Sequence, residues 1–378
     1  MNQPVLLHIV ERLEGFLGKL PDTIRKPILS ELTPLKELFL QQRPPRFLFI
    51  GSSKMPMPQI MHALFSPDAE TQTRVDVMPV HRWADWDMQG HGTVSALDAR
   101  DADDSAQTPI KEELTGQPAD IIFFLNHDEK GRGPNKGDLE RLVASVSWND
   151  AEPIKARILA ISVGSENSVA RLEEALNAQP TIRDRLLKVV HFTEKESAET
   201  HRLLALLAHE LPNEAKIEWI RISHDSEAQH HIAQVLVKST TAICTAIGTQ
   251  PIPLADLPIL TTLQLVMVSG IMYVSGRERS LRAATEFIGA LGANVGAGML
   301  LREGTRAILK FFPGWGNIVC GMVAGAGTYA IGRAATAFFL EGVSLKDARR
   351  TYLANRKRRS QQALLPPKPG KATPARKK

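Results

Sequence analysis

The stretch RFLFIGSSKMPMPQIMHALF, residues 46–65, has the layout of a phosphate-binding loop: an apolar strand, a glycine turn and the start of an apolar helix. Such a loop reads G-x-x-x-x-G-K-[ST], and its backbone N–H groups hold phosphate oxygens at the N-terminus of the helix. When the stretch is aligned from Gly51, the second Gly falls on Pro56, the Lys on Met57 and the Ser/Thr on Pro58. The residues of the turn that could still contact a phosphate are Gly51, Ser52, Ser53 and Lys54.

Each replacement removes a specific part of the chemistry. Proline has no N–H, so Pro56 and Pro58 delete two donors from the phosphate cradle. Met57 cannot supply a cation to the β- and γ-phosphates, and Pro58 cannot coordinate Mg²⁺. Pro58 instead suits the first turn of a helix, where the missing N–H costs nothing. We therefore expect no hydrolysis of GTP or ATP here and no catalytic residue.

The elements around this loop alternate between strands and helices. The predicted strands are FLFIG (47–51), RVDVMPV (74–80), TVSAL (93–97), DIIFFLN (120–126), RILAISVG (157–164) and KVVHFT (188–193). The predicted helices are QIMHALF (59–65), DLERLVASV (138–146), VARLEEALNA (169–178) and AETHRLLALLAHEL (198–211). This alternation predicts a mostly parallel sheet covered on both faces. The link between the second and third strands is too short for a crossover helix, so we expect an antiparallel pair at one edge.

A six-stranded sheet with one antiparallel edge pair resembles the Ras-like and Era-like GTPase domains, which have a P-loop-type α/β fold. The resemblance implies a D-x-x-G loop after the third strand, with the Asp on the Mg²⁺ side and the Gly amide at the γ-phosphate. Here Asp98 is present, but Asp101 replaces the Gly, and its carboxylate would repel a polyphosphate. The resemblance also implies [NT]-K-x-D after the fifth strand, where residues 164–167 read GSEN.

The residual nucleotide site implied by the resemblance consists of Gly51, Ser52, Ser53, Lys54 and Asp98. We expect it to bind no cofactor and no metal, with GTP and Mg²⁺ as the alternative. Residues 135–138 spell N-K-G-D, but they directly precede a predicted helix, and we interpret Asp138 as its N-cap.

Other residues of chemical interest have structural readings. His224, His230 and His231 match no common zinc spacing, and a surface helix is the favoured interpretation over a metal site. Trp83 and Trp86 are interpreted as packing on an edge strand, with a ligand platform as the alternative.

Beyond about residue 225 the chain is predicted to be helical and rich in Ala, Gly and Leu. The uncharged intervals 257–276 and 311–332 match the roughly 20 residues that span a bilayer. The glycines Gly321, Gly325 and Gly332 give one helix a small-residue face, which allows close packing in lipid. The alternative is a soluble helical bundle in which these small residues pack against neighbouring helices of the same protein.

Two blocks of this half resemble the bacterial domain-of-unknown-function family 697, over roughly residues 235–342. The first block is Pro251-Ile252-Pro253 with Asp256, Gln264, Met267 and Tyr273; the second is Arg306, Lys310, Pro313, Gly314 and Gly316, followed by GAGTYAIG (325–332). The resemblance implies a helical domain behind a GTPase fold, sometimes in membrane-associated proteins. It implies no reaction.

The net charge of +5 hides an uneven distribution. From Lys346 onward there are twelve Lys/Arg and one Asp, which leaves 34 basic and 40 acidic residues before it. Such a tail attracts anionic lipid or nucleic acid without sequence preference, and a disordered solvated tail is the alternative. Cys244 and Cys320 lie in apolar stretches, which fits a reducing compartment.

We expect four segments: a helical extension (1–45), a degenerate GTPase-like α/β domain (46–222), an all-α hydrophobic domain (223–345) and a disordered basic tail (346–378). The favoured hypothesis is a non-hydrolytic scaffold or regulatory protein at the cytoplasmic face of the membrane, with a purely cytoplasmic location as the alternative. Its expected partners are membrane lipid or a membrane protein, a competent GTPase, or a second copy of the chain. One rival is an atypical protein that binds GTP weakly, and the other is a soluble protein that binds nucleic acid through the tail.

Overall fold

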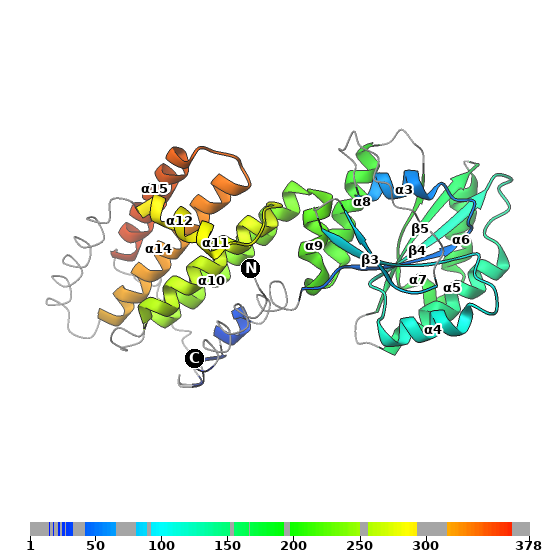
Figure 1. The fold of residues 1–378 in the computed structure, drawn as a ribbon, viewed down its shortest axis with the longest axis horizontal. Helices are drawn as coiled ribbons and strands as arrows, with labels where there is room; N and C mark the ends of the chain where they lie inside the picture. Colours follow the sequence, from blue (N-terminus) through cyan, green and yellow to red (C-terminus); the bar gives the residue numbers. More distant parts are fainter. Residues whose placement is uncertain are drawn as a thin grey trace, which may run out of the picture. The chain divides into compact units, whose positions relative to one another are not determined.

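The computed structural model describes residues 42–65, 81–88, 92–151, 155–165, 167–192, 197–249, 256–292 and 316–364, with single residues and short pieces between 15 and 32. The chain divides into two compact units, one formed by residues 36–229 and one by residues 1–35 and 230–378. In Figure 1 the first unit is a sheet flanked by helices, and the described part of the second is helical.

The described part of the α/β unit is built on a six-stranded sheet in the order β2-β3-β1-β4-β5-β6. Its strands are β1 (Arg46–Gly51), β2 (Ala84–Asp87), β3 (Thr93–Arg100), β4 (Ile121–Asp128), β5 (Arg157–Gly164) and β6 (Leu186–His191). All neighbouring pairs are parallel except β2 and β3, which are antiparallel. This arrangement confirms the prediction of a mostly parallel sheet with one antiparallel edge pair.

Helices cover both faces of this sheet (Figure 1). They are α3 (Met57–Phe65), α4 (Gln107–Gly116), α5 (Lys136–Trp148), α6 (Asn167–Asn177), α7 (Pro180–Arg183), α8 (Ser197–Glu210) and α9 (Asn213–Ser223). Because successive strand residues face opposite sides, Leu48 and Ile50 pack in one cluster with α4 to α7. On the other face, Phe47 makes an edge-to-face contact with Trp219 of α9. Both faces of β1 are thus buried, which explains its unbroken apolar sequence.

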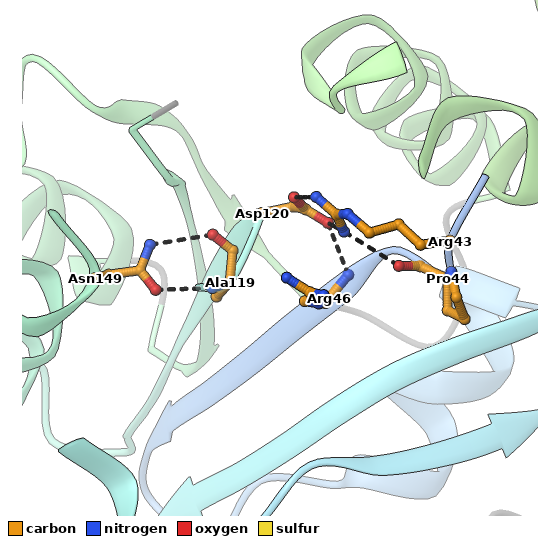
Figure 2. Close-up of polar contacts among 6 residues, drawn as sticks. All are labelled: Arg43, Pro44, Arg46, Ala119, Asp120 and Asn149. Carbon is orange, nitrogen blue, oxygen red and sulfur yellow. Dashed lines mark hydrogen bonds and ion pairs between the residues drawn. The ribbon is translucent and has the colours of Figure 1, made fainter. Parts of the chain in front are cut away.

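Two side chains fix the start of β4 (Figure 2). The carboxylate of Asp120 accepts hydrogen bonds from both terminal nitrogens of Arg43, at 2.7 and 2.6 Å, and from the backbone N–H of Arg46 at 2.8 Å. The amide of Asn149 accepts from the N–H of Ala119 at 2.7 Å and donates to its carbonyl at 3.1 Å. Asp120 thus ties the start of β1 to the start of β4. The candidate site lies at the opposite ends of these two strands.

One predicted strand differs from the observed edge. The predicted strand 74–80 lies outside the described residues, and the described edge strand β2 comes later, at Ala84–Asp87. Its Trp86 stacks on Phe49 with ring centroids 6.0 Å apart, and Trp83 packs against the cluster beneath α4 and α5. The interpretation of the tryptophans as edge-strand packing is therefore confirmed.

The second unit contains α10 (Ser226–Gly248), α11 (Asp256–Val274), α12 (Leu281–Gly292), α14 (Gly316–Phe339) and α15 (Leu345–Leu364). Residues of the N-terminal segment belong to the same packing: Ile28 and Leu32 are buried in one cluster with Ile243, Cys244 and Ile247 of α10. Glu31 adds a polar contact, since Ser239 of α10 donates to its carboxylate at 2.6 Å.

The glycine face of α14 packs inside this unit. A Cβ at Gly321 would overlap the methyl group of Thr249, and one at Gly325 would overlap the hydroxyl of Thr245. A Cβ at Gly332 would lie 2.5 Å from a methyl carbon of Val237. These three glycines therefore allow α14 to approach α10 closely. No helix among the residues described by the structure is long and apolar enough to cross a membrane.

The prediction of a disordered tail from Lys346 is wrong for its first part, because α15 extends to Leu364. The hydroxyl of Ser344 caps its start, accepting from the backbone N–H of Asp347 at 3.2 Å. The helix packs along α14 and α12, with Ala348 fully buried. Charge density alone suggested disorder, but a capping residue and one small apolar face are enough to form a packed helix.

Candidate nucleotide site

The turn after β1 needs glycine because of the neighbouring strand. Gly51 has a φ of +118°, a region that side chains other than glycine rarely adopt. A Cβ here would overlap the carbonyl oxygen of Leu125 in β4, and the next residue, Ser52, donates its N–H to that same oxygen at 2.9 Å. Close packing between β1 and β4 thus explains why Gly51, the first glycine of the phosphate-loop pattern, is a glycine.

Four backbone amides of this turn donate to acceptors within the protein. Lys54 donates its N–H to the hydroxyl of Ser52 at 3.2 Å, and Met55 donates to the Ser52 carbonyl at 3.4 Å. Met57 donates to the carbonyl of Met55 at 2.8 Å. In a phosphate loop such amides point at the ligand. Here Ser52, Lys54, Met55 and Met57 all have internal acceptors, and the prolines supply no further donor.

The side chains of this turn are placed differently from those of a phosphate loop. Met57, at the position of the phosphate-binding lysine, begins α3 with its side chain 2% exposed. Pro58 follows in the first turn of α3, as expected, and the carbonyl of Pro56 accepts from the N–H of Ile60 at 3.0 Å. Lys54 is exposed. The cation position is therefore filled by a core thioether, which cannot neutralise phosphate.

The carboxylate expected on the Mg²⁺ side is held by a cation of the chain itself. Asp98 accepts from Nε of Arg100 at 2.8 Å and from Nη2 at 2.6 Å, and also from the Arg100 backbone N–H at 3.1 Å. The two residues are only 2% and 8% exposed. Bidentate pairs of this geometry are the strong form of the arginine–carboxylate interaction. Both oxygens of Asp98 are therefore already bound to a full positive charge.

A second contact joins the two loops that would surround a nucleotide. The hydroxyl of Ser53, in the β1–α3 turn, donates to the carboxylate of Asp101, which follows β3. Asp101 also donates its backbone N–H to the carbonyl of Gly51 at 3.0 Å, and its φ of +46° lies in the left-handed region. The residue that replaces the γ-phosphate glycine thus occupies the space between the loops with its own side chain.

The structure brings the five predicted site residues onto neighbouring segments. In the register of the sheet, Phe49 lies beside Asp98 and Gly51 beside Arg100, so the turn and the end of β3 meet at one edge. Sequence reasoning missed Arg100 and the contact between Ser53 and Asp101. The sequence did contain a signal for Arg100, because residues two apart on a strand, such as Asp98 and Arg100, share a face.

Where the GTPase resemblance implies a base-binding motif after β5, the sequence reads GSEN (164–167). Gly164 ends β5 with a φ of +138°, and a Cβ there would overlap the carbonyl oxygen of Asp128 in β4. The Asp128 carboxylate accepts the backbone N–H groups of Arg132 at 2.9 Å and Gly133 at 2.8 Å. Burial of Asp128 raises the pKa of its carboxyl group, but the backbone N–H groups around it outweigh that effect and the pKa is lowered overall. This loop is organised by an internal carboxylate.

The N-K-G-D stretch is the start of α5. The N-cap is Asn135, whose side-chain oxygen accepts from the N–H of Gly137 at 2.9 Å. The assignment of Asp138 as N-cap is therefore wrong: Asp138 lies in the first turn and pairs with Arg141. Asn and Asp are about equally favoured as N-caps, so the sequence alone could not decide between them.

A pocket of about 270 Å³ lies between α4 and α5 in the α/β unit. Its lining contains none of the five predicted site residues. The lining residues are Ile50, Ala99, Ala102, Asp104, Gln107, Ile110, Gly137, Glu140, Arg141, Ala144, Ser145 and Trp148. Within the described residues, no group of three or more His, Cys, Asp or Glu side chains is placed to hold a metal ion.

No family model matches this chain, and no curated protein matches it. The sheet order, with its antiparallel edge strand and a strand–turn–helix unit at β1, is compatible with a P-loop-like nucleotide-binding fold.

Proposed function

We propose that this chain is a GTPase-like protein that does not hydrolyse nucleotide and acts as a scaffold or regulatory partner at the cytoplasmic face of the membrane. The observation that carries the first part of the proposal is the buried ion pair between Asp98 and Arg100. In a working site the corresponding carboxylate is on the Mg²⁺ side. In this chain a guanidinium group supplies the positive charge that the metal would supply.

The energy of this pair opposes the binding of a metal-bound nucleotide. For Mg²⁺ to use Asp98, Arg100 would have to leave a site where it is 8% exposed, or remain there without its counter-ion. Removing one partner of a buried ion pair typically costs about 3–5 kcal/mol. The neighbouring turn would add few contacts to phosphate, because the amides of Ser52, Lys54, Met55 and Met57 are already hydrogen-bonded and Met57 carries no charge.

A scaffold role agrees with what the same residues do instead. Gly51 and Gly164 are used for close packing against β4, and Ser53 and Asp101 join the two loops. These contacts hold the surface in one arrangement without a ligand. The membrane part of the proposal is supported by the excess of basic residues from Lys346 onward.

The nucleotide part is tested by titrating the full chain with a fluorescent GTP analogue in Mg²⁺, beside a competent GTPase as a positive control. We expect no binding at micromolar concentrations and no phosphate release. A matched Lys54→Ala variant decides what any signal means. Micromolar binding that disappears in Lys54→Ala would show a working site at the β1–α3 turn and would overturn the proposal in favour of an atypical GTP-binding protein.

A further inference from the structure

The helix α15 has one face against its neighbours and one face in solvent. Ala348 is fully buried and Tyr352 is half-buried where α15 packs along α14 and α12. The Tyr352 hydroxyl accepts from Arg356 at 3.1 Å, so this cation belongs to the packed side. From Lys346 to Lys357 the residues on the opposite side are exposed.

The exposed side carries a stripe of three cations and one leucine. Lys346, Arg350, Leu353 and Lys357 follow one another at steps of four, three and four residues, which places them along one line of an α-helix. All four are exposed, and Leu353 reaches 51%. Arg350 makes an exposed pair with Asp347 at 3.2 Å, while the ammonium groups of Lys346 and Lys357 have no ion-pair partner among the described residues.

This combination of side chains matches the surface of an anionic bilayer. Cations on a helix face are attracted to acidic headgroups, and an apolar side chain between them can enter the boundary of the acyl chains. Nucleic acid would also attract the cations, but the stripe contains no aromatic side chain on which a base could stack. The exposed Leu353 in the middle of the stripe would make no favourable contact with the charged phosphates of a nucleic-acid backbone.

We propose that α15 binds anionic lipid headgroups through Lys346, Arg350 and Lys357, with Leu353 inserted between the headgroups. This assignment rests on the membrane location proposed above and names the surface and the class of lipid responsible. It makes the interaction dependent on lipid charge and weaker at high salt, because exposed charges are screened.

The test is co-flotation of the full chain with vesicles of phosphatidylcholine alone or of equal parts phosphatidylcholine and phosphatidylglycerol. We expect flotation only with the anionic vesicles. The triple variant Lys346→Gln, Arg350→Gln, Lys357→Gln should lose about a hundredfold in lipid partitioning, since each cation near an acidic surface contributes about fivefold. Leu353→Ala should weaken partitioning several-fold without changing its dependence on lipid charge.

A matched control removes the same net charge elsewhere. Lys111, Lys130 and Lys136 are exposed on the α/β unit, and their triple change to Gln should leave flotation as in the wild type. If the wild type floats and both triple variants float equally well, the assignment to α15 is wrong while the membrane location stands. If the wild type floats with neither vesicle, the membrane location itself fails. Loss of duplex DNA binding in the α15 variant, with unchanged flotation, would assign the stripe to nucleic acid and overturn the proposal.

Discussion

Arg100 and Asp98 lie two residues apart on β3 and form a bidentate ion pair inside the protein, with nitrogen–oxygen distances of 2.8 and 2.6 Å. The alternation of side chains along a strand places both on the same face, and the end of β1 lies beside them in the sheet. The chain therefore carries the counter-charge for Asp98 in its own sequence. An arginine cannot exchange with solvent as a metal ion does, so this charge is fixed in the fold.

This pair predicts a strong dependence of stability on Arg100. The variant Arg100→Met leaves the Asp98 carboxylate buried without a partner, which should lower the free energy of unfolding by about 3–5 kcal/mol. The double variant Asp98→Asn, Arg100→Met removes both charges and should recover most of that loss. Urea unfolding followed by tryptophan fluorescence measures both effects. A single variant as stable as the wild type would show that the pair carries no weight in the fold.

The loop after β4 predicts a pH dependence that comes from Asp128. Its backbone hydrogen bonds lower the pKa of the carboxyl group below its ordinary value despite burial. A lowered pKa in the folded state adds stability that is present above the unfolded-state pKa and is lost as pH falls through the folded-state pKa. Asp128→Asn should therefore cost about 1–3 kcal/mol at neutral pH, where the carboxylate accepts two backbone N–H groups.

The comparison at two pH values makes this prediction specific. At about pH 3 the wild-type carboxyl group is partly protonated in the unfolded chain and loses its advantage, so the difference between Asp128→Asn and wild type should shrink. Free energies of unfolding from urea titrations at the two pH values give that difference. A gap that stays constant or widens in acid would mean that the hydrogen bonds of Asp128 do not favour its charged form.

The sequence was sufficient for the parts of the fold that depend on local pattern. The strand at 157–164 has the bounds predicted for it, because it is apolar, rich in β-branched residues and ended by Gly164. The strand–turn–helix at β1 and α3 follows from the same kind of signal. The degenerate chemistry of the turn was also visible, since proline and methionine lack the groups that bind phosphate whatever the fold.

The sequence was not sufficient where tertiary contacts decide. The edge strand β2 reads ADWD, an alternation of only four mostly exposed residues, which is too short to predict a strand, and it pairs with β3 as an antiparallel neighbour. Helix α15 is so rich in charge that its composition suggested disorder, yet packing of Ala348 orders it. The spacing of Asp98 and Arg100 on one strand pointed to their pairing, but the burial of the pair depends on the packing around β3. In each case the sequence did not show which other elements pack against the residues concerned.

Cys244 is predicted to be chemically inert in the native chain. Burial raises the pKa of its thiol to about 11, against a smaller opposing effect from Thr328. The thiolate is the reactive form, so at about pH 8 roughly one thousandth of the thiol is ionised. In a Cys320→Ser background, a thiol reagent should modify the urea-unfolded chain quickly and the native chain hardly at all. Rapid labelling of the native chain would show that the cluster around Ile243 and Ile247 opens to solvent.

The last prediction concerns the glycines of α14 and uses two positions on the same helix. At Gly332 an added methyl group would lie 2.5 Å from one methyl carbon of Val237 and 2.8 Å from the other, and Val237 is buried. A β-branched side chain has little freedom to turn away. Gly332→Ala should therefore lower the free energy of unfolding by about 1–3 kcal/mol through overpacking.

Gly327 is the matched control, because nothing lies within 4 Å of the position its Cβ would take. Gly327→Ala should raise the free energy of unfolding by about 0.5–1 kcal/mol, since alanine reduces the entropy that the helix loses on folding. Urea unfolding of the two single variants, followed by far-UV circular dichroism, gives both values. Opposite signs would show that the small residues of α14 are required by packing against α10. If Gly332→Ala were as stable as Gly327→Ala, the close approach of these two helices could not be the reason for the glycine.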